Sequence, residues 1–561
     1  MGAVVVAGAL ALTVAGAPAT APDVALGQRM YRDGLLPSGQ PLHGILQGDL
    51  PAEGSHLQCM TCHRRSGFGS SEGATFVPPI TGPSLFQPSE LQRADRFRKL
   101  YEEDLAGRFW VRVREQRARP AYTDDTLAAA LREGKDPTGR ALDPLMPRYM
   151  LSDEDMGHLI AYLKSLSSTP VPGVDASAIH FATVVTDGVE PAKRQAMHAV
   201  MDAYVRWKNT DTRGLVQRPG HSPWHKDDFY GAYRTWVLHV WELRGPADTW
   251  PVQLNTYYRA QPVFALLSGI GGGEWRPVHD FCERAEMPCL FPHTDLPVIS
   301  PPGAYALYFS KGLTVEAEAL ASYLHEQSRS ITTRQIVQVY RDTASGRVPA
   351  QALRQALQGY GKARLQDRVI DSAQGLAPTF WKHLVQDEQP AILVLWLEDM
   401  DVEGLRSLLD STDGLQHLQQ LYLSSSLLRE TLPSVPEGLR AKIRLTYPFA
   451  LPELAVPQLY RVRAWLRARG VKGTTHERLQ LNTHLVLEIA DHALEHLGEN
   501  FSRDFFIERI EDMMENVSNP GVFPYLSLGP GQRFASKGCY IVKLSDRAKG
   551  GLEAVSDWIS P

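Results

Sequence analysis

The most specific chemical pattern in the sequence is Cys59-Met60-Thr61-Cys62-His63, which has the form C-x-x-C-H. Two thiols at this spacing can add to the vinyl groups of a haem, and the histidine that follows is then placed to bind the iron. A zinc site would need a second ligand pair at finger-like spacing, and none follows. A thioredoxin-type redox pair would lie in a βαβ unit. The pattern therefore predicts one haem c, attached through Cys59 and Cys62, with His63 as an iron ligand.

A haem that only transfers electrons needs a second axial ligand, and Met146 is the first choice. It lies 83 residues after His63 (146 minus 63), just ahead of a helix that Ser152 and Asp155 can cap. One face of that helix is apolar, because the spacing of Met156, Leu159, Ile160, Leu163 and Leu166 is helical. A methionine in a loop ahead of a packed helix can be aimed rigidly at iron. Without the haem motif we would interpret Met146 as a core residue. The rival ligands are Met150, Met156, His43 and His56.

The start of the chain indicates export. Val4 to Ala17 is a run of small apolar residues and one threonine, and Ala17-Pro18-Ala19 then offers a cleavage site. We expect residues 1–19 to be a signal peptide, although no Lys or Arg precedes the run, which a start codon chosen too late would explain. An N-terminal membrane anchor is the alternative. No later stretch approaches the roughly 20 apolar residues that span a bilayer. The prediction is a periplasmic protein without a membrane span after signal removal.

Residues 22–168 resemble a class I cytochrome c. Gly27 and Tyr31 match the family's N-terminal helix, Tyr162 matches the C-terminal helix that crosses it, and Met146 with its following proline matches the family's Met-Pro. The resemblance implies an all-α domain that carries out one-electron transfer with a periplasmic redox enzyme or another cytochrome. The family also holds its proximal histidine with a proline carbonyl. We assign that role to Pro79, with Pro83 as the alternative.

Residues 88–120 look like an insertion in that family's pattern, and they are basic. Nine basic residues outnumber six acidic ones there: Arg93, Arg96, Arg98, Lys99, Arg108, Arg112, Arg114, Arg117 and Arg119 against Glu90, Asp95, Glu102, Glu103, Asp104 and Glu115. They predict a docking face for an acidic redox partner or cover for the haem propionates, or else a solvated helix face. The whole chain has a formal net charge of -5, so no overall basic field indicates nucleic acid as a partner.

A break follows at Ser168–Ser177, where two prolines and a glycine cannot extend a helix, so residues 169–177 are predicted to be a linker. Beyond it, short apolar runs alternate with helical segments, which is typical of parallel sheets built from βαβ units. The strand-like runs are Ile179–Thr186, Trp236–Glu242, Val263–Ser268, Cys289–His293, Gln335–Tyr340, Ala391–Leu397 and Gln420–Leu423. Residues 178–561 are too many for one such sheet, so two lobes are expected, with crossovers near 300–305 and 440–455.

Residues 178–561 resemble the type I periplasmic binding proteins, the receptor class of ABC importers for branched-chain amino acids and related solutes. The matching segments are Ile179–Thr186, Val263–Gly273, Pro288–Asp295 and a late strand at Arg533–Val542. Glycines 269, 271, 272 and 273 end a strand and open a helix, where backbone N–H groups can approach an anion. The resemblance implies a small solute, such as an amino acid or organic acid, held by Ser268, Gly271, Gly272 and Thr294. A turn that only needs positive φ angles is the alternative.

The remaining cysteines suggest no catalytic arrangement. Cys282 and Cys289 lie seven residues apart and can form a disulfide in an exported protein, while Cys539 is expected to be a buried apolar residue. A haem enzyme such as a peroxidase would need an open coordination position at the iron.

The sequence thus predicts a non-enzymatic, multidomain protein, in which an all-α cytochrome c domain is followed by a two-lobed α/β binding fold. Its function would be one-electron transfer beside a solute-binding or docking module. The alternative is a solute receptor for an importer or sensor, with the haem as a redox reporter.

Overall fold

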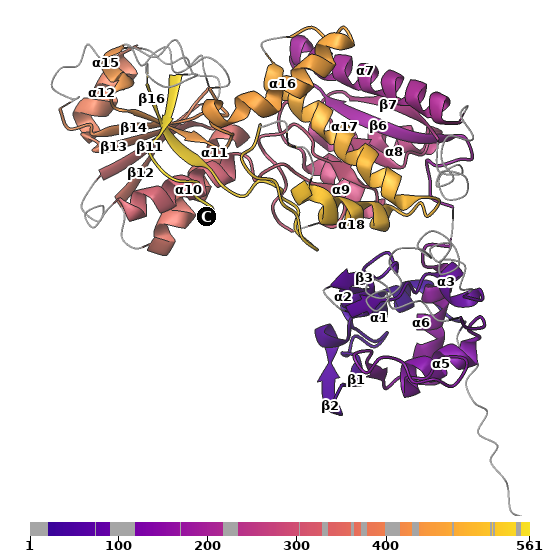
Figure 1. The fold of residues 1–561 in the computed structure, drawn as a ribbon. Helices are drawn as coiled ribbons and strands as arrows, with labels where there is room; N and C mark the ends of the chain where they lie inside the picture. The colour runs from indigo at the N-terminus through magenta and orange to yellow at the C-terminus, as the bar shows by residue number, and fades with distance from the viewer. Residues whose placement is uncertain are drawn as a thin grey trace, which may run out of the picture. The chain divides into compact units, whose positions relative to one another are not determined.

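The computed structural model divides into two compact units, residues 1–169 and 170–561 (Figure 1). Within them it describes residues 21–72, 75–89, 118–168, 170–216, 234–301, 303–327, 335–360, 364–371, 378–398, 416–428, 437–473, 476–516, 519, 522–545 and 551–561. The expected signal peptide at 1–19 and the basic residues 93–117 lie outside this part of the chain.

The described part of the first unit contains five short α-helices and two small antiparallel sheets. The helices are α1 (Val24–Asp33), α2 (Cys59–His63), α3 (Gly82–Phe86), α5 (Asp124–Glu133) and α6 (Asp153–Ser165). One sheet has the order β2 (Leu50–Glu53), β1 (His43–Leu46), β5 (Arg148–Tyr149), and the other pairs β3 (Ser70–Glu72) with β4 (Thr75–Val77). The unit is therefore not all-α as predicted. Gly44 lets β1 approach β5, since a Cβ there would lie 2.7 Å from the Arg148 carbonyl oxygen.

Helices α1 and α6 pack closely at Gly27. A Cβ added to this glycine would lie 2.1 Å from the His158 carbonyl oxygen and 2.7 Å from the Cβ of Tyr162, so only glycine fits. Next to this contact, the rings of Tyr31 and Tyr162 lie 5.2 Å apart. Ser152 caps α6 by accepting the Asp155 N–H, as the sequence predicts. The predicted contact between the two helices is therefore present, and it forms the centre of the first unit's core.

Most of the predicted linker is part of the second unit. Gly173 accepts a hydrogen bond from the His180 N–H, and Val174 forms a β-bridge with Ile179. The Asp175 carboxylate accepts from the Ser177 and Ala178 N–H groups. These bonds fold residues 173–177 onto the strand that follows, because the turn satisfies polar groups that a free tether would leave to water.

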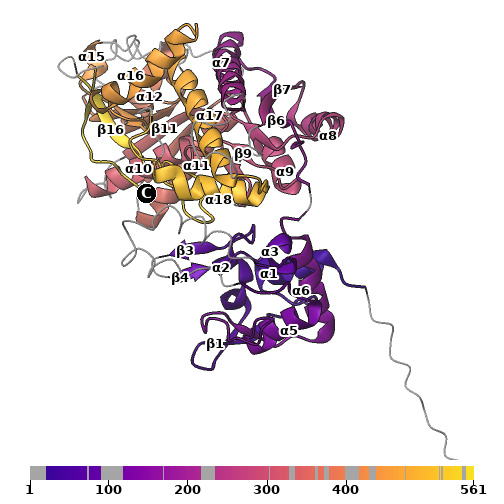
Figure 2. The same ribbon diagram turned by 45° about the vertical axis from the view of Figure 1, so that its right-hand side comes forward.

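The first lobe of the second unit is a five-stranded parallel sheet. Its order is β10 (Ala306–Leu307), β9 (Cys289–Leu290), β8 (Ala265–Leu267), β6 (Ala178–Thr186), β7 (Thr235–Leu243). Its helices are α7 (Pro191–Val216), α8 (Trp250–Ala260) and α9 (Arg276–Arg284), joined by α16 (Pro452–Ala468), α17 (Glu477–Leu497) and α18 (Arg503–Met513) from late in the chain. Figure 2 shows α17 and α18 lying over this lobe. The burial of apolar residues from both parts of the chain holds them there.

The second lobe is a seven-stranded sheet, and β12 (Arg364–Ile370), β11 (Gln335–Arg341), β13 (Ile392–Trp396), β14 (Gln420–Ser424) and β15 (Ile443–Tyr447) are its parallel strands. Two antiparallel strands, β16 (Tyr540–Leu544) and β17 (Leu552–Ala554), complete it. Its helices are α10 (Leu313–Glu326), α11 (Ala344–Tyr360), α12 (Pro378–Glu388) and α15 (Glu437–Arg440). Strand β13 is buried along its whole length, as expected for a strand with helices on both faces.

In its described part the chain passes between the lobes three times, before α10, between β15 and α16, and before β16. The first passage comes later than the predicted 300–305, because β10 still pairs with β9 in the first lobe. The second falls within 440–455. The third corrects the single late strand predicted at Arg533–Val542, since Phe534 bridges to Tyr308 in the first lobe and Tyr540 pairs in the second.

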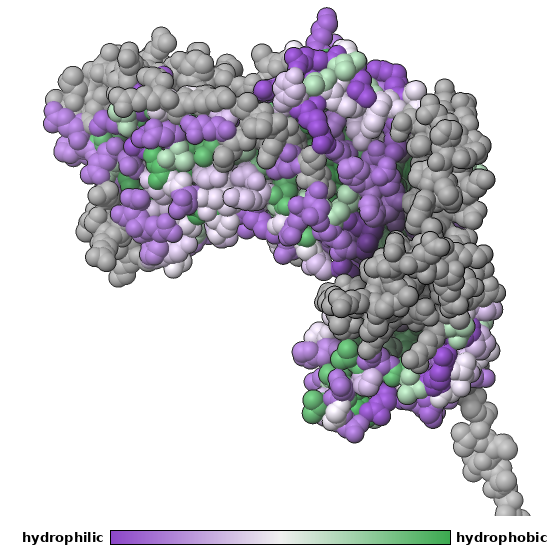
Figure 3. Space-filling view, viewed as in Figure 1, coloured by the Kyte–Doolittle hydropathy of each residue, from purple (hydrophilic) through white to green (hydrophobic). Residues whose placement is uncertain are grey.

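The described helices include none that is long and apolar enough to cross a membrane. Figure 3 shows a surface on which hydrophilic side chains dominate, with hydrophobic ones scattered among them.

Candidate functional site

The C-x-x-C-H residues form α2, a single helical turn. Residues three apart lie on the same side of a helix, so Cys59 and Cys62 are neighbours, and His63 follows at the end of the turn. Cys59 is buried, Cys62 is exposed and His63 is only 6% exposed. Two thiols and one imidazole therefore converge without help from distant segments.

The imidazole of His63 is oriented by a backbone carbonyl. Its Nδ1 lies 3.0 Å from the carbonyl oxygen of Pro78, so Nε2 is the nitrogen available to bind a metal. Burial lowers the pKa of His63 to about 4, which keeps the ring neutral as a ligand must be. The residue that orients the histidine is thus Pro78, and neither Pro79 nor Pro83. The two adjacent prolines are alike in the sequence, and only the direction of the backbone distinguishes their carbonyls.

Tyr149, on β5, is a neighbour of the motif that the sequence analysis missed. Its hydroxyl donates to the Leu57 carbonyl at 3.1 Å and lies 3.6 Å from the sulfur of Cys59. Burial raises the pKa of Cys59 to about 11, so the residue is a protonated thiol. The only available signal was the position of Tyr149 in the Met146–Tyr149 segment.

The candidates for the second axial ligand occupy different environments. Met146 is partly buried against the core of the first unit, in a turn where its N–H donates to the Asp143 carbonyl. Met156 is 3% exposed within α6, and Met150 is 67% exposed. The side chains of His43 and His56 face solvent. Met146 is thus the one of these five that is neither locked in the core nor turned to water.

These residues fit a haem c. The thiols lie one turn apart, the imidazole is neutral with Nε2 available, and a thioether side chain sits in a loop of the same unit. Arg119, the described member of the basic group, donates to the carbonyls of Ser84 and Leu85 and packs over the ring of Tyr122. The guanidinium of Arg119 therefore makes its contacts within the first unit, where they stabilise the fold, and is not free to bind a partner protein.

The glycine loop of the second unit uses its amide groups internally. The Gly271 N–H donates to the His293 carbonyl, and the Gly272 N–H donates to the Thr186 hydroxyl. A Cβ at Gly269 or Gly271 would lie 3.0 Å from the ring of Trp275, which is fully buried against the loop. Gly269 and Gly271 therefore make room for a tryptophan, and the N–H groups of Gly271 and Gly272 are used inside the protein.

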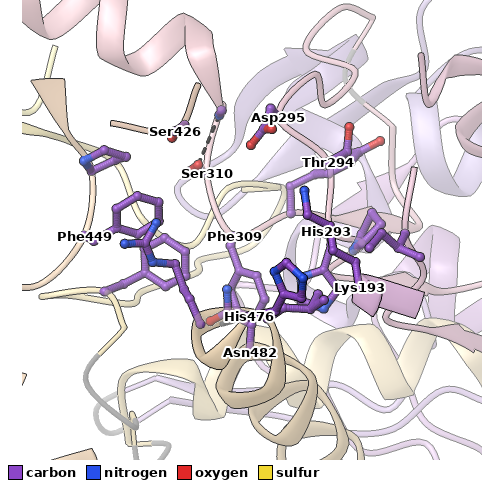
Figure 4. A pocket seen from close by; sticks show the side chains of 18 of the residues that line it. Lys193, His293, Thr294, Asp295, Phe309, Ser310, Ser426, Phe449, His476 and Asn482 are labelled. Atoms are coloured by element: carbon purple, nitrogen blue, oxygen red, sulfur yellow. Dashed lines mark hydrogen bonds between the residues drawn. The ribbon is translucent and has the colours of Figure 1, made fainter. Parts of the chain in front are cut away.

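A cavity of about 410 Å³ does lie between the two lobes (Figure 4). Of the four predicted ligand residues, Thr294 lines it, whereas Ser268, Gly271 and Gly272 are not among its lining residues. Ser268 is 1% exposed and donates to the sulfur of Met197, away from the cavity. The polar and charged lining residues are Glu190, Lys193, His293, Thr294, Asp295, Ser310, Ser426, His476, Arg478 and Asn482.

Several of these polar groups are already paired within the protein. His293 lies 3.1 Å from the Thr483 hydroxyl, and burial lowers the pKa of His293 to about 3, so its ring is neutral. His476 lies 3.8 Å from the Glu190 carboxylate. The Thr294 hydroxyl accepts the Leu296 N–H. These contacts fix the wall of the cavity. The choice of solute therefore depends more on lining residues whose polar groups are not already paired.

Two residues of α17 stand out because no hydrogen bond from the described residues reaches the Arg478 guanidinium or the amide oxygen of Asn482. The guanidinium of Arg478 lies 3.5 Å from the centre of the Phe449 ring. The amide oxygen of Asn482 is buried and has no hydrogen-bond partner among the described residues. The sequence analysis missed both residues, since an arginine and an asparagine four apart on a helix carry no signal of their own.

The chain matches no family model, and no curated protein matches its sequence. Among solved structures, a fatty acid ABC transporter substrate-binding protein from Thermomonospora curvata is similar. It has 15% identity and a TM-score of 0.50, over 70% of this chain and 95% of that one. A branched-chain amino acid ABC transporter from Thermus thermophilus with bound valine shows 14% identity and a TM-score of 0.51, over 69% and 98%.

The second unit has a type I periplasmic substrate-binding fold. The predicted two-lobed α/β architecture is thus confirmed. The cavity is lined by residues of the first lobe such as Thr294, by Ser426 of the second lobe and by residues of α17, and Figure 4 shows side chains from these segments around it.

Proposed function

We propose that the chain is a periplasmic solute-binding receptor that also carries a haem c in its first unit. The observation that carries the receptor function is the cavity between the lobes, lined by buried polar and aromatic side chains of a substrate-binding fold. The similar Thermus protein holds valine, which supports a small organic solute here. Two lobes joined by crossing segments can close on such a solute like a hinge, and no bond needs to be made or broken.

The test of receptor function is ligand-dependent stability of the full chain. A solute at 100 times its Kd stabilises a protein by about 2.7 kcal/mol, so a screen of amino acids and organic acids should raise the Tm. Thr294→Trp, which fills the cavity, should abolish the shift. Thr256→Trp on the exposed face of α8 is the control and should keep it. If no solute shifts the wild-type Tm, the receptor proposal is wrong.

A specific observation favours a second function in the first unit. His63 sits on the C-x-x-C-H turn, neutral and oriented by Pro78, in the state that an iron ligand requires. Cys59 and Cys62 would attach the haem, and His63 and Met146 would hold its iron. The haem would supply a one-electron couple for exchange with a periplasmic redox enzyme or another cytochrome. The haem would then serve as an electron carrier or as a redox reporter of the receptor.

The haem proposal is tested by producing the full chain with a cytochrome c maturation system. The protein should keep haem stain through denaturing electrophoresis, and its spectrum should switch between oxidised and reduced forms with ferricyanide and dithionite. Protein that is soluble and free of stain would refute the proposal. Repeating the redox titration with a solute found in the Tm screen separates a carrier, whose potential is unchanged, from a reporter, whose potential moves.

A further inference from the structure

Among the described residues, one cationic side chain of the cavity between the lobes has no carboxylate partner. Glu190 faces His476, and both Lys193 and Asp295 have partners within the protein. Arg478 differs, because in the described part of the chain its guanidinium makes no hydrogen bond or ion pair and only covers the ring of Phe449. A guanidinium has five N–H donors in a planar fork that matches a carboxylate. The carboxylate of an anionic solute would neutralise the Arg478 guanidinium and accept its hydrogen bonds.

Asn482 requires a hydrogen-bond donor as its partner. It is 7% exposed and lines the cavity, and its amide oxygen has no hydrogen-bond partner among the described residues. A buried acceptor without a donor is costly, so a solute that brings an O–H or N–H to this oxygen is favoured over one that does not. A solute that matches the cavity therefore carries an acid group and a separate hydrogen-bond donor.

The two groups reach different parts of the cavity, although they lie one turn apart on α17. The head of Arg478 lies at Phe449, on the segment that connects the lobes after β15. Asn482 stays close to α17, and Figure 4 shows it well apart from Phe449. An α-amino acid carries both its charged groups on one carbon. A solute that meets Arg478 and Asn482 together needs its acid and its donor at opposite ends of a body.

Part of the cavity wall is aromatic. Phe309 and Phe523 stack with ring centres 5.2 Å apart, and Phe449 lies 5.8 Å from Phe523. All three line the cavity. Flat aromatic walls are best filled by another flat ring, which gains burial and ring–ring contact at little entropic cost.

We infer that the solute is a small aromatic carboxylate with a hydroxyl donor, of the hydroxybenzoate class. Its carboxylate binds Arg478, its hydroxyl donates to the Asn482 oxygen, and its ring lies against the phenylalanines. The inference rests on the proposed receptor function and adds the substrate class.

The experiment is calorimetric titration of the full chain with four probes: 4-hydroxybenzoate, benzoate, 4-hydroxybenzyl alcohol and leucine. We expect 4-hydroxybenzoate to bind tightest, benzoate at least fivefold more weakly because it lacks the donor, and the uncharged alcohol at least tenfold more weakly because it lacks the anion. Leucine should not compete.

Two variants assign these differences to residues. Arg478→Met should weaken both benzoates at least tenfold, while Arg467→Met, exposed on α16, should leave them unchanged. Asn482→Leu should weaken 4-hydroxybenzoate about fivefold and spare benzoate, while Asn255→Leu on α8 should affect neither. If Arg478→Met fails to fold, Arg478→Lys keeps the charge without the fork and should still weaken binding.

The outcomes separate the two proposals. Binding of leucine, or of another solute in the Tm screen, without binding of either benzoate overturns the substrate class and leaves the receptor function standing. Absence of binding by every solute overturns both. Tight binding of 4-hydroxybenzoate that is unaffected at Arg478 and Asn482 overturns the assignment of the two residues.

Discussion

In the first unit the reactive side chains occupy one helical turn, Cys59–His63, whereas the cavity of the second unit is lined by residues spread from Glu190 to Phe523. Outside the turn, the carbonyl of Pro78, fifteen residues away, orients the ring of His63. The cavity needs two lobes and the passages between them. A site within one turn should therefore fail as a whole when one residue is replaced, while a cavity from many segments should lose one contact at a time.

The two units also differ in the contacts that hold their buried polar groups. The histidine of the C-x-x-C-H turn is oriented by Pro78, fifteen residues away, although Tyr149 reaches Cys59 from 90 residues away. In the second unit the Glu316 carboxylate on α10 is buried and accepts a hydrogen bond from Thr446, 130 residues later. A long-range pair of this kind contributes only after a long loop has closed, and that closure costs chain entropy.

The largest expected effect is loss of the haem from Cys59→Ala, Cys62→Ala. Without thiols no covalent bond to the haem can form, so haem stain after denaturing electrophoresis should vanish completely. The control is Cys282→Ala, Cys289→Ala, which removes two buried free thiols of the second unit and should leave the stain intact. Stain retained by the first double variant would break the assignment of the turn.

Replacement of Met146 should change the haem without removing it. Met146→Ala should lower the reduction potential and let carbon monoxide bind the iron, since a thioether ligand raises the potential and fills the sixth position. Spectroelectrochemistry measures both effects. Met150→Ala, at a side chain that is 67% exposed, is the matched control. The same change in both variants, or in neither, would move the role to another residue.

Glu316 tests the long-range contacts of the second lobe through pH. Burial raises the pKa of Glu316 to about 7, while an unfolded glutamate titrates near 4.5. The folded state thus favours the protonated carboxyl of Glu316. The stability that this group gives the folded chain is fully present below about pH 4.5, and it is lost as the pH rises to about 7. Glu316→Gln should remove this dependence and stabilise the chain by about 3 kcal/mol at pH 8.

The measurement is urea unfolding of wild type and Glu316→Gln from pH 4.5 to 8. Glu318→Gln, two residues later and ion-paired with Lys311 near the surface, should run parallel to wild type. If all three curves are parallel, the Glu316 carboxylate does not titrate with folding, and the contrast between the units in their buried polar contacts loses its main support.

The smallest expected effect compares two glycines of the first unit. Gly27→Ala should destabilise this unit by about 1–3 kcal/mol, because the new Cβ meets the His158 carbonyl oxygen at 2.1 Å. Gly157→Ala on α6 has room, with its nearest neighbour at 3.8 Å, and should stabilise the helix by about 0.5–1 kcal/mol. Thermal unfolding of the full chain and of each variant gives both values. Equal effects would show that the helix contact is looser than the structure indicates.

The sequence alone predicted the features that depend on short spacing. The C-x-x-C-H turn, the Ser152 cap of α6 and the alternation of strands and helices after residue 178 are readable because local residues produce them. The contact of Gly27 with α6 was accessible only through resemblance to a known family. The small sheets of the first unit were not predicted, since their strands are two to four residues long.

Tertiary structure alone decided which carbonyl holds His63, where the chain crosses between lobes, and what lines the cavity. Pro78 and Pro79 are indistinguishable until the backbone has a direction. Gly271 and Gly272 carried the pattern of an anion loop, but Trp275 and two internal acceptors use that loop. Arg478 and Asn482 both line the cavity, and only the folded chain places Arg478 over the ring of Phe449. Contacts between segments far apart in the chain are set by packing, and packing leaves no periodic trace in the sequence.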